Sequence, residues 1–376
     1  MMGQFKKILK FIFHIIFKIL YNSFSLLPIK KNQVLFASDR RENLSDNFSF
    51  IFSEIKKQQL PIDCKFAFNL KQNSMKQIVQ LAYLLARSKV ILVDDYYPYI
   101  YPLKIRQNSE IIQVWHAVGA FKRFGFSLTG VHGAPKLDPF MHRNYSKAIV
   151  SSKNVASHYA EAFNMSENQI VATGIPRTDV FFDEEYKSKK IVGLYDRFPF
   201  LKDKKVIMYA PTFRGKGKNT AYYPLAKVDF AKWHNALKED YVFLIKWHPY
   251  IKEKVVIPEE FASFYYDVSD YSDINDLLFV TDILITDYSS VCFEYALLRK
   301  PIIFYAFDVE DYTHNRDFYY PYESFIPGPL VKESQELLET IQEEKFDMSL
   351  IDDFVNYFFD HQDGKSSERF VNQLLK

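Results

Sequence analysis

The chain alternates short apolar runs with longer amphipathic runs, and this alternation begins after Pro28. Short apolar runs bounded by polar residues are typical of strands that are buried on both faces. The longer runs place apolar residues at helical spacing. The predicted strands are 34–38, 65–69, 90–94, 111–115, 148–151, 170–173, 206–210, 242–246, 264–268, 283–286 and 302–305. The predicted helices are 48–57, 75–87, 228–238, 274–280, 290–298, 333–342 and 365–375.

This alternation of strands and helices favours parallel sheets that are covered by helices on both faces. A polar, charged stretch at 182–190 interrupts the pattern and is predicted to be a hinge. We therefore predict an α/β protein with two doubly wound, Rossmann-like domains, at 29–190 and 191–376, that face each other across a cleft. In sheets of this kind, ligands bind at the carboxyl ends of the strands.

Residues 1–28 follow a different pattern, which predicts an N-terminal amphipathic helix. Basic side chains occupy one side of it: Lys6, Lys7, Lys10, His14 and Lys18. The other side is apolar and consists of Phe5, Ile8, Leu9, Ile12, Ile15, Ile16 and Ile19. The charges disfavour a transmembrane helix, and no small-residue cleavage site of a secretory signal follows. We predict that this helix lies on the membrane surface; packing on its own protein and a membrane span are the alternatives.

Composition and charge narrow the class of protein. The chain has 376 residues, of which 48% are hydrophobic and 25% charged, and this indicates a globular protein of two domains. The net charge is +2, but residues 1–31 carry six lysines and no acid, so the other residues carry about −4. A basic end on a mildly acidic body argues against a general nucleic-acid-binding protein. Cys64 and Cys292 are far apart in the sequence, which indicates neither a disulfide framework nor a zinc site and fits a reducing compartment.

Three polar corners follow predicted strands in the second half of the chain: "YAPTFRG" (209–215), "IKWHP" (245–249) and "TDYSS" (286–290). In a parallel sheet these corners lie at the same edge. Together they contribute Thr212, Arg214, Lys246, His248, Ser289 and Ser290. Cations, hydroxyls and the N–H groups of a starting helix suit a diphosphate. The alternatives are that the serines only cap the following helix and that His248 is a structural histidine.

Other features of the second half refine the predicted ligand. Glu294 lies one helical turn after Ser290, where it is placed to hold a ribose hydroxyl or is an ordinary acid of the first turn. No GxGxxG sequence lies at a strand–helix corner, and neither a Walker sequence nor an Asp-x-Asp triplet occurs. We therefore expect protein cations, rather than an obligatory metal or a cofactor, to neutralise the diphosphate.

The first half contributes "QVWHAVGAFKRFGF" (113–126), in which His116 directly follows a predicted strand. A histidine at a strand end that faces the cleft is a candidate general base, because imidazole titrates near the working pH. A structural histidine is the alternative. The segment "TGIPRTD" (173–179) adds Arg177, which we expect at the other side of the cleft.

These segments, with "FEYALLRKPIIFY" (293–305), "RDFYYPYE" (316–323) and "PGPL" (327–330), occur in an order that resembles the CDP-glycerol glycerophosphotransferase family. The resemblance covers roughly residues 30–335. It implies a two-domain, GT-B-like fold at the inner face of the cell membrane. It also implies transfer of glycerol phosphate, or of ribitol phosphate in some members, from a CDP-activated donor to a lipid-linked acceptor in the synthesis of wall teichoic acid.

The resemblance implies residue roles. His116 becomes the candidate base, and His248 the second candidate catalytic residue. The implied donor-binding residues are His116, Ala117, Val118, Gly119, Ala120, Arg177, Pro211, Thr212, Lys246, Trp247, His248, Ser289, Ser290 and Glu294. Many polymerising members have Trp-His-Gly where this chain has Trp-His-Ala at 115–117, which favours a member that adds the first unit.

The predicted reaction transfers glycerol phosphate from CDP-glycerol to a hydroxyl of an undecaprenyl-diphosphate-disaccharide type of acceptor, with release of CMP. We expect a peripheral enzyme on the cytoplasmic face of the membrane, without a nucleic-acid partner. Three alternatives stay open: a ribitol-phosphate, polymerising or capsular transferase of the same family, a GT-B transferase that uses a UDP-sugar, and a membrane-surface scaffold without activity.

Overall fold

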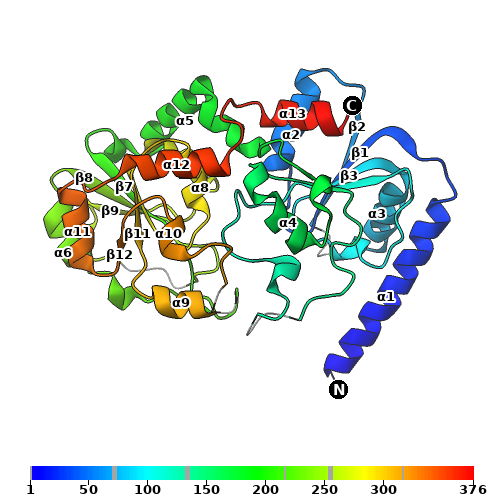
Figure 1. Cartoon of the computed structure of the whole chain (residues 1–376), viewed down its shortest axis with the longest axis horizontal. Helices are drawn as coiled ribbons and strands as arrows, with labels where there is room; N and C mark the ends of the chain where they lie inside the picture. Colours follow the sequence, from blue (N-terminus) through cyan, green and yellow to red (C-terminus); the bar gives the residue numbers. More distant parts are fainter. Residues whose placement is uncertain (1, 70–73, 132–135, 216, 253–256, 316) are drawn as a thin grey trace. The chain divides into compact units, whose positions relative to one another are not determined.

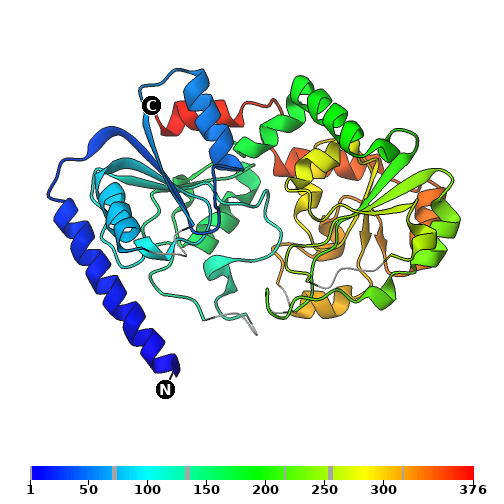
Figure 2. The same ribbon diagram turned by 180° about the vertical axis from the view of Figure 1, so that it is seen from behind.

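The computed structural model describes residues 2–69, 74–131, 136–215, 217–252, 257–315 and 317–376, except for the side chains of 2–10 and 315. The chain divides into two compact units (Figures 1 and 2). Unit 1 comprises Met1–Asp179 with Phe359–Lys376, and unit 2 comprises Val180–Phe358. Each unit has one six-stranded parallel sheet. Within the described residues, no helix has the combination of length and apolar composition that crossing a bilayer requires.

The sheet of unit 1 has the strand order β2-β1-β3-β4-β5-β6, and all neighbouring strands are parallel. Its strands are β1 (Lys30–Ser38), β2 (Asp63–Phe68), β3 (Ser88–Val93), β4 (Glu110–Gln113), β5 (Lys147–Ile149) and β6 (Ile170–Val171). Its α-helices are α1 (Met2–Phe24), α2 (Asn47–Lys57), α3 (Met75–Arg87), α4 (Ala156–Phe163) and α13 (Ser366–Leu374). The apolar runs of the sequence form the central strands, which are buried on both faces.

The sheet of unit 2 has the order β12-β11-β10-β7-β8-β9 and is also parallel. Its strands are β7 (Lys205–Tyr209), β8 (Tyr241–Ile245), β9 (Tyr265–Asp267), β10 (Ile283–Thr286), β11 (Ile302–Tyr305) and β12 (Leu330–Val331). Its α-helices are α5 (Glu184–Arg197), α6 (Phe230–Leu237), α7 (Ile274–Val280), α8 (Val291–Ala296), α9 (Val309–Asn315), α10 (Tyr322–Phe325), α11 (Ser334–Gln342) and α12 (Met348–Phe358). The two predicted doubly wound domains are thus confirmed as two parallel-sheet α/β units.

The observed boundary differs from the predicted one. The predicted hinge at 182–190 is wrong, because most of it forms the start of α5, which Asp183 caps by accepting from the Tyr186 N–H at 2.9 Å. Leu194 is the buried residue of α5, so its sequence has no apolar stripe that marks a helix. The predicted boundary after residue 190 therefore falls inside a helix of unit 2.

The end of the chain returns to unit 1 instead of continuing the second domain. Helix α13 packs beside α2, as Figure 1 shows. The carboxylate of Asp179 accepts from the N–H groups of Ser366 and Ser367, both at 2.8 Å, and so caps the first turn of α13. An amphipathic helix near the end of a sequence does not reveal which sheet it will cover.

Helix α1 packs on unit 1 through aromatic side chains. It lies along α3, and Phe17 and Tyr21 are almost fully buried. The rings of Phe13 and Phe17 lie 6.1 and 5.8 Å from Tyr99, measured between centroids. The predicted N-terminal helix is therefore present, and the alternative in which it packs on its own protein applies to this aromatic face.

A second apolar face of α1 points away from the protein. Its described members are between 43% and 66% exposed: Phe11, Ile12, Ile15, Ile16 and Ile19. The N-terminal part of the helix extends beyond the rest of unit 1 in both views (Figures 1 and 2). The described members of the face that the sequence predicts as membrane-facing are thus uncovered, and their contact with a membrane stays a prediction.

Candidate active site

The three polar corners of unit 2 follow β7, β8 and β10, which are neighbours in the order β10-β7-β8. Because the strands are parallel, the corners lie side by side at the carboxyl edge of one sheet. The sequence-based prediction that they come together is confirmed within this unit. Some of their side chains connect the corners to each other and to neighbouring loops, and others are candidates to contact a ligand.

Asp287, at the end of β10, holds two of the corners together. Its side chain is fully buried. Oδ1 accepts hydrogen bonds from the backbone N–H groups of Thr212 (2.7 Å) and Tyr288 (2.6 Å). Oδ2 accepts from Arg214 Nη1 at 2.9 Å. A carboxylate at this position fastens the corner after β7 to the corner after β10.

Arg214 was predicted to bind the diphosphate, but its guanidinium is engaged inside unit 2. Nε and Nη2 donate to the two oxygens of Asp308, at 2.6 and 2.8 Å, while Nη1 donates to Asp287. Its side chain is buried beside the stacked rings of Tyr288 and Tyr312, whose centroids each lie 5.0 Å from the guanidinium carbon. Burial acts to lower the pKa of Arg214, but the two carboxylates raise it. This geometry favours a structural role for Arg214.

Lys246 is engaged in a similar way at the end of β8. Its Nζ donates to the carbonyl oxygens of Ser269 at 2.8 Å and Tyr271 at 2.5 Å, in the loop after β9. Burial lowers the pKa of Lys246, against the opposing charges of nearby aspartates. The next residue, Trp247, is buried against Tyr223 and donates its backbone N–H to Ser269 Oγ at 2.9 Å. Both residues fix the corner that carries His248.

His248 has the geometry of a hydrogen-bond donor to a ligand. Its Nδ1 accepts from the Tyr250 N–H at 3.1 Å, which leaves the ring proton of the neutral imidazole on Nε2. The ring lies 4.6 Å from the ring of Phe213, between centroids, and is partly exposed. An oriented Nε2–H suits a phosphate oxygen.

Hydroxyl groups complete this edge. Ser289 and Ser290 are partly exposed; Ser289 Oγ accepts from the Val291 N–H at 3.4 Å, while Ser290 makes no side-chain cap bond to α8. Thr212 Oγ1, next to the buried Pro211, is buried and has no hydrogen-bond partner among the described residues. The predicted capping role therefore applies to Ser289. Glu294 is buried in α8 one turn after Ser290, as the sequence predicts.

The candidate base His116 lies at the carboxyl edge of the unit 1 sheet, three residues after β4 ends at Gln113. Its Nδ1 is 3.1 Å from the carbonyl oxygen of Asp94, which follows β3. Because a carbonyl only accepts, Nδ1 carries the proton and Nε2 has the lone pair. Burial, with the charge of Arg40, lowers the pKa of His116 to about 3. The imidazole is therefore neutral at physiological pH and able to accept a proton at Nε2.

The loop after His116 is held by a buried tyrosine. Tyr159 OH, on α4, donates to the carbonyl oxygen of Gly119 at 2.8 Å and approaches that of Ala117 at 3.3 Å. Gly119 has a φ of +65°, a conformation that favours glycine. Val118 and Ala120 belong to this loop, and their side chains are buried. These residues therefore determine the backbone conformation next to His116.

Arg177 lies directly beside His116, which corrects its predicted place at the other side of the cleft. Its Nη1 donates to the carbonyl oxygen of His116 at 2.8 Å and to Asp46 Oδ1 at 3.1 Å. Burial acts to raise the pKa of Asp46, but the charges of Arg177 and Arg41 outweigh it and lower that pKa to about 2. Arg177 thus ties the segment after β6 to the His116 backbone.

Sequence reasoning missed the remaining residues of this edge. They follow β1 and β3 and comprise Arg40, Arg41, Asp46, Asn47, Asp94 and Asp95. Arg41 donates to Asp94 and to Asp46, each at 2.5 Å, and Asn47 Nδ2 donates to the Trp115 carbonyl at 3.0 Å. The signal was present, because charged clusters follow both predicted strands, as they do in the second half.

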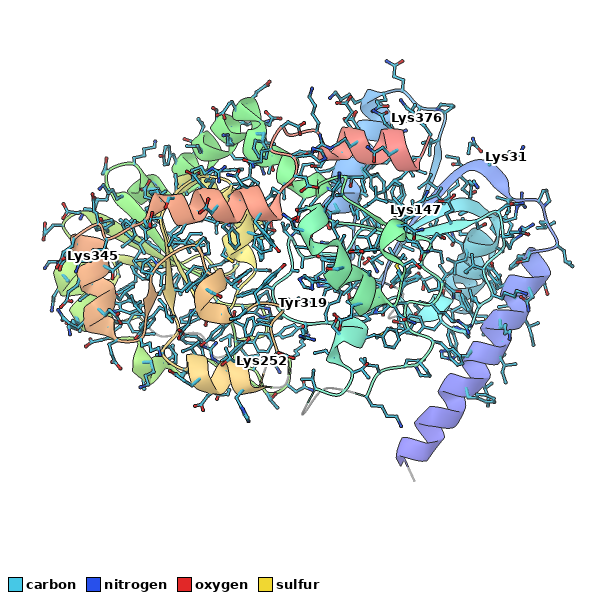
Figure 3. The ribbon with its side chains drawn as sticks, viewed as in Figure 1. Lys31, Lys147, Lys252, Tyr319, Lys345 and Lys376 are labelled. Carbon is cyan, nitrogen blue, oxygen red and sulfur yellow. The ribbon has the colours of Figure 1, made fainter. Side chains whose placement is uncertain are left out.

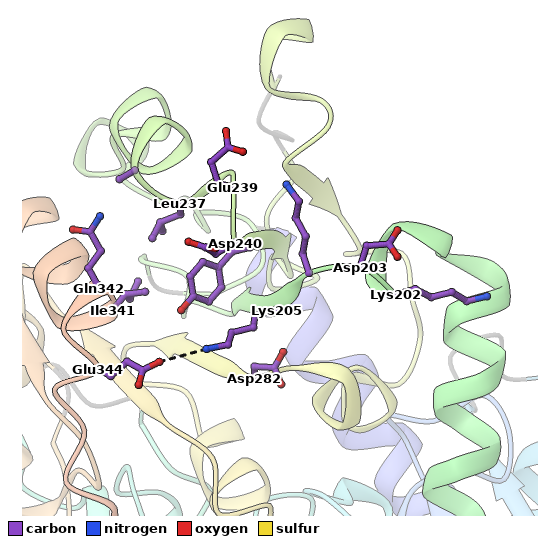
Figure 4. Close-up of a pocket in the computed structure, with 13 residues that line it drawn as sticks. Lys202, Asp203, Lys205, Leu237, Glu239, Asp240, Asp282, Ile341, Gln342 and Glu344 are labelled. Carbon is purple, nitrogen blue, oxygen red and sulfur yellow. Dashed lines mark hydrogen bonds and ion pairs between the residues drawn. The ribbon is translucent and has the colours of Figure 1, made fainter.

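Two hollows among the described residues lie at the opposite edges of the sheets. One of about 720 Å³ in unit 2 is lined by the strand starts at Lys205, Tyr241 and Asp282, and Lys205 forms an ion pair across it with Glu344 (Figure 4). A smaller one in unit 1 is lined by Lys31, Lys147 and Lys376, labelled in Figure 3. Ligands of parallel sheets bind at carboxyl edges, so neither hollow is the candidate site. In the described ranges, no cluster of three or more His, Cys, Asp or Glu residues could hold a metal ion.

Two parallel-sheet α/β units of this kind define a GT-B-like fold. The structure of the wall teichoic acid polymerase TagF aligns with this chain at a TM-score of 0.79 and 24% sequence identity, over 100% of this chain and 97% of that one. Another structure of that polymerase, from a soak with CDPG, aligns at a TM-score of 0.78. At this identity, the likeness shows the fold alone.

The chain belongs to the CDP-Glycerol:Poly(glycerophosphate) glycerophosphotransferase family, whose sequence pattern matches residues 19–376. It is 51% identical over 363 residues to the teichoic acid poly(ribitol-phosphate) polymerase of Bacillus spizizenii, covering 96% of this chain and 59% of that relative. It is 39% identical over 387 residues to the teichoic acid ribitol-phosphate primase of the same species, covering 98% of this chain and 97% of the primase. The predicted family is therefore confirmed.

The buried contacts of Asp287 generate a prediction about stability. Asp287→Asn removes the charge that Arg214 requires and turns one acceptor oxygen into a donor. Breaking a buried pair in this way costs about 3–5 kcal/mol, so the free energy of unfolding should fall by that amount. Urea titration followed by circular dichroism measures the change. Asp203→Asn, at an exposed position of the same unit, should change it by less than about 0.5 kcal/mol. Equal stabilities of the two variants would contradict the role of Asp287.

Proposed function

We propose that this chain transfers a polyol phosphate from a CDP-activated donor to a hydroxyl of a lipid-linked acceptor in teichoic acid synthesis, with release of CMP. The observation that carries the proposal is the family match over residues 19–376. Because both relatives described above are named for ribitol phosphate, CDP-ribitol is favoured over CDP-glycerol as the donor. The acceptor is of the undecaprenyl-diphosphate-disaccharide type.

In the proposed reaction, the acceptor hydroxyl attacks the β-phosphorus of the donor. The bond from that phosphorus to the bridging oxygen breaks, and CMP leaves. His116 Nε2 accepts the proton of the hydroxyl, because its lone pair is available while Nδ1–H is held by the Asp94 carbonyl. Phosphoryl transfer depends mainly on positioning and on electrostatic stabilisation, which hydrogen-bond donors supply.

The proposed donor site is the carboxyl edge of unit 2. His248 donates its Nε2–H to a diphosphate oxygen, and Thr212 and Ser290 contribute hydroxyls. Glu294 is proposed to hold a ribose hydroxyl. Arg214 and Lys246 keep these corners in place through their own carboxylate and carbonyl partners instead of contacting the phosphates.

A donor comparison tests the proposed function. The purified chain is incubated with a lipid-linked disaccharide and with CDP-ribitol, CDP-glycerol or a UDP-sugar, and the released nucleotide is identified. Acceptor-dependent release of CMP, fastest with CDP-ribitol, is expected. Release of UDP would instead favour the sugar transferase, and the absence of turnover with every donor would favour the scaffold.

We predict that His116→Ala lowers the rate of transfer by ~10² to 10⁴, the usual effect of removing a general base. Affinity for CDP, measured by calorimetry, should stay within about tenfold because the donor site is proposed in unit 2. His361→Gln, a partly exposed histidine of unit 1, is the matched control and should leave the rate unchanged. A His116→Ala variant that turns over at a near-normal rate would rule out the proposed base.

We predict the complementary effect for His248→Ala. A hydrogen bond to a charged phosphate contributes roughly 1.5–3 kcal/mol, so CDP should bind about 10- to 150-fold more weakly. The control is His234→Gln on α6, whose ring packs against Phe261. If His248→Ala binds CDP as tightly as the intact chain and keeps its rate, His248 is structural.

We further propose that the chain is peripheral on the cytoplasmic face of the membrane, bound through the exposed isoleucine face of α1. The aromatic face of that helix packs on unit 1 and leaves Ile12, Ile15 and Ile19 uncovered. Lysines of the same helix add attraction to anionic lipid of about 1 kcal/mol each.

The triple variant Ile12→Ser, Ile15→Ser, Ile19→Ser should therefore no longer float with anionic liposomes, since each buried isoleucine contributes about 1.5–3 kcal/mol. Exposed apolar residues of unit 2 provide the control, as Val192→Ser with Leu350→Ser, which should float normally. Activity on a short soluble acceptor should persist in both variants. Unchanged flotation of the triple variant would show that another surface binds the membrane.

A further inference from the structure

The acidic side chain of Asp95 lies beside His116 and takes no part in the reaction described so far. Asp95 follows β3 by two residues, and its Oδ2 is 3.6 Å from His116 Nδ1. The same nitrogen is 3.1 Å from the Asp94 carbonyl oxygen. The side chains of Asp95 and His116 are 21% and 25% exposed, so bulk water screens the pair only in part.

A buried glutamine fixes the backbone positions of Asp95 and His116 relative to each other. Gln113, at the end of β4, donates from Nε2 to the backbone carbonyl of Asp95 at 3.1 Å. Its Oε1 accepts from the backbone N–H of Trp115 at 2.9 Å. One fully buried side chain therefore links the backbone of Asp95 to the residue before His116. Asp95 Oδ1 accepts from the Tyr96 N–H at 2.7 Å, and this contact orients the carboxylate.

The other acids of this edge already have close cationic partners. Asp94 pairs with Arg41 at 2.5 Å, and Asp46 pairs with both Arg41 and Arg177. Asp95 has a longer ion pair, to Arg40 at 3.8 Å, and the Arg40 side chain is half exposed. Asp95 is thus the acid whose charge is best placed to act on the imidazole.

We propose that Asp95 is a positioning residue that orients the His116 imidazole and stabilises the imidazolium formed during transfer. This inference rests on the proposed role of His116 as the base. The hydroxyl proton moves to His116 Nε2, the proton on Nδ1 stays in place, and Asp95 remains a carboxylate throughout. No bond to Asp95 forms or breaks.

The protonation state of Asp95 then sets a pH dependence. Burial raises the pKa of its carboxyl to about 6, whereas the pKa of His116 is lowered to about 3 by burial and Arg40. Asp95 is anionic above pH 6 and neutral below it, so the transfer rate should fall as the pH falls through about 6. The charged and titratable groups that act on Asp95 or on the adjacent His116 are Arg40, Arg41, Asp46, Asp94, Tyr96, Tyr101, Tyr145 and Arg177.

The test compares Asp95→Asn with the conservative Asp95→Glu and with Asp63→Asn, a control at the start of β2. Single-turnover release of CMP from CDP-ribitol, with a lipid-linked disaccharide, is measured from pH 5 to pH 9. Partners that orient a metal-binding histidine contribute about 10- to 100-fold to affinity or activity, and we expect a similar factor for His116. Asp95→Asn should lose that much of the rate and lose the acidic limb, with CDP affinity unchanged. Asp95→Glu should restore part of both, and Asp63→Asn should match the intact chain.

A second readout separates this inference from the proposed function. In nitrogen-15 NMR spectra of the labelled chain at pH 7, where Asp95 is anionic, His116 should be protonated at Nδ1, and its Nδ1 chemical shift should change in Asp95→Asn. Identical His116 spectra and pH profiles for the intact chain and Asp95→Asn would overturn the inference, even if His116→Ala is inactive. Conversely, an active His116→Ala variant would overturn the base and, with it, the catalytic role of Asp95.

Discussion

The carboxylate of Asp287 is the constraint on which the candidate donor site depends. It is fully buried at a strand end, where a negative charge is costly unless several donors surround it. The backbone of Thr212 and the guanidinium of Arg214 supply those donors, and both come from the corner after β7. An acid between a buried strand and a buried helix therefore joins two corners of the sheet, so that the neighbouring polar groups are held in a fixed arrangement.

Unit 1 meets the same requirement with a different set of charges. Asp46 and Asp94 are paired with Arg41 and Arg177, and these pairs surround the backbone that carries His116. Most charged groups at the two edges thus hold the corners in place. The proposed reaction uses two histidines whose rings are oriented by hydrogen bonds. His116 has its lone pair on Nε2, and His248 has its proton on Nε2.

The sequence predicted the fold well because buried parallel strands are apolar runs with polar ends. It located His116, His248 and the three corners for the same reason. It did not predict α5, whose solvent-facing residues hide the helical pattern, or the return of α13 to unit 1, which depends on a contact between Asp179 and residues far along the chain. It also assigned Arg214 and Lys246 to the ligand, since a sequence shows charges without showing the buried partners that engage them. The cleft between the units stays a prediction.

Hydrogen–deuterium exchange of the intact chain with and without CDP tests the central claim most directly. Binding at the carboxyl edge of unit 2 should slow backbone exchange in segments 211–214, 246–248 and 286–291. Segments 202–205 and 239–241, at the hollow on the opposite edge, should exchange at the same rate in both samples. Protection of the latter segments without protection of the three corners would contradict the account.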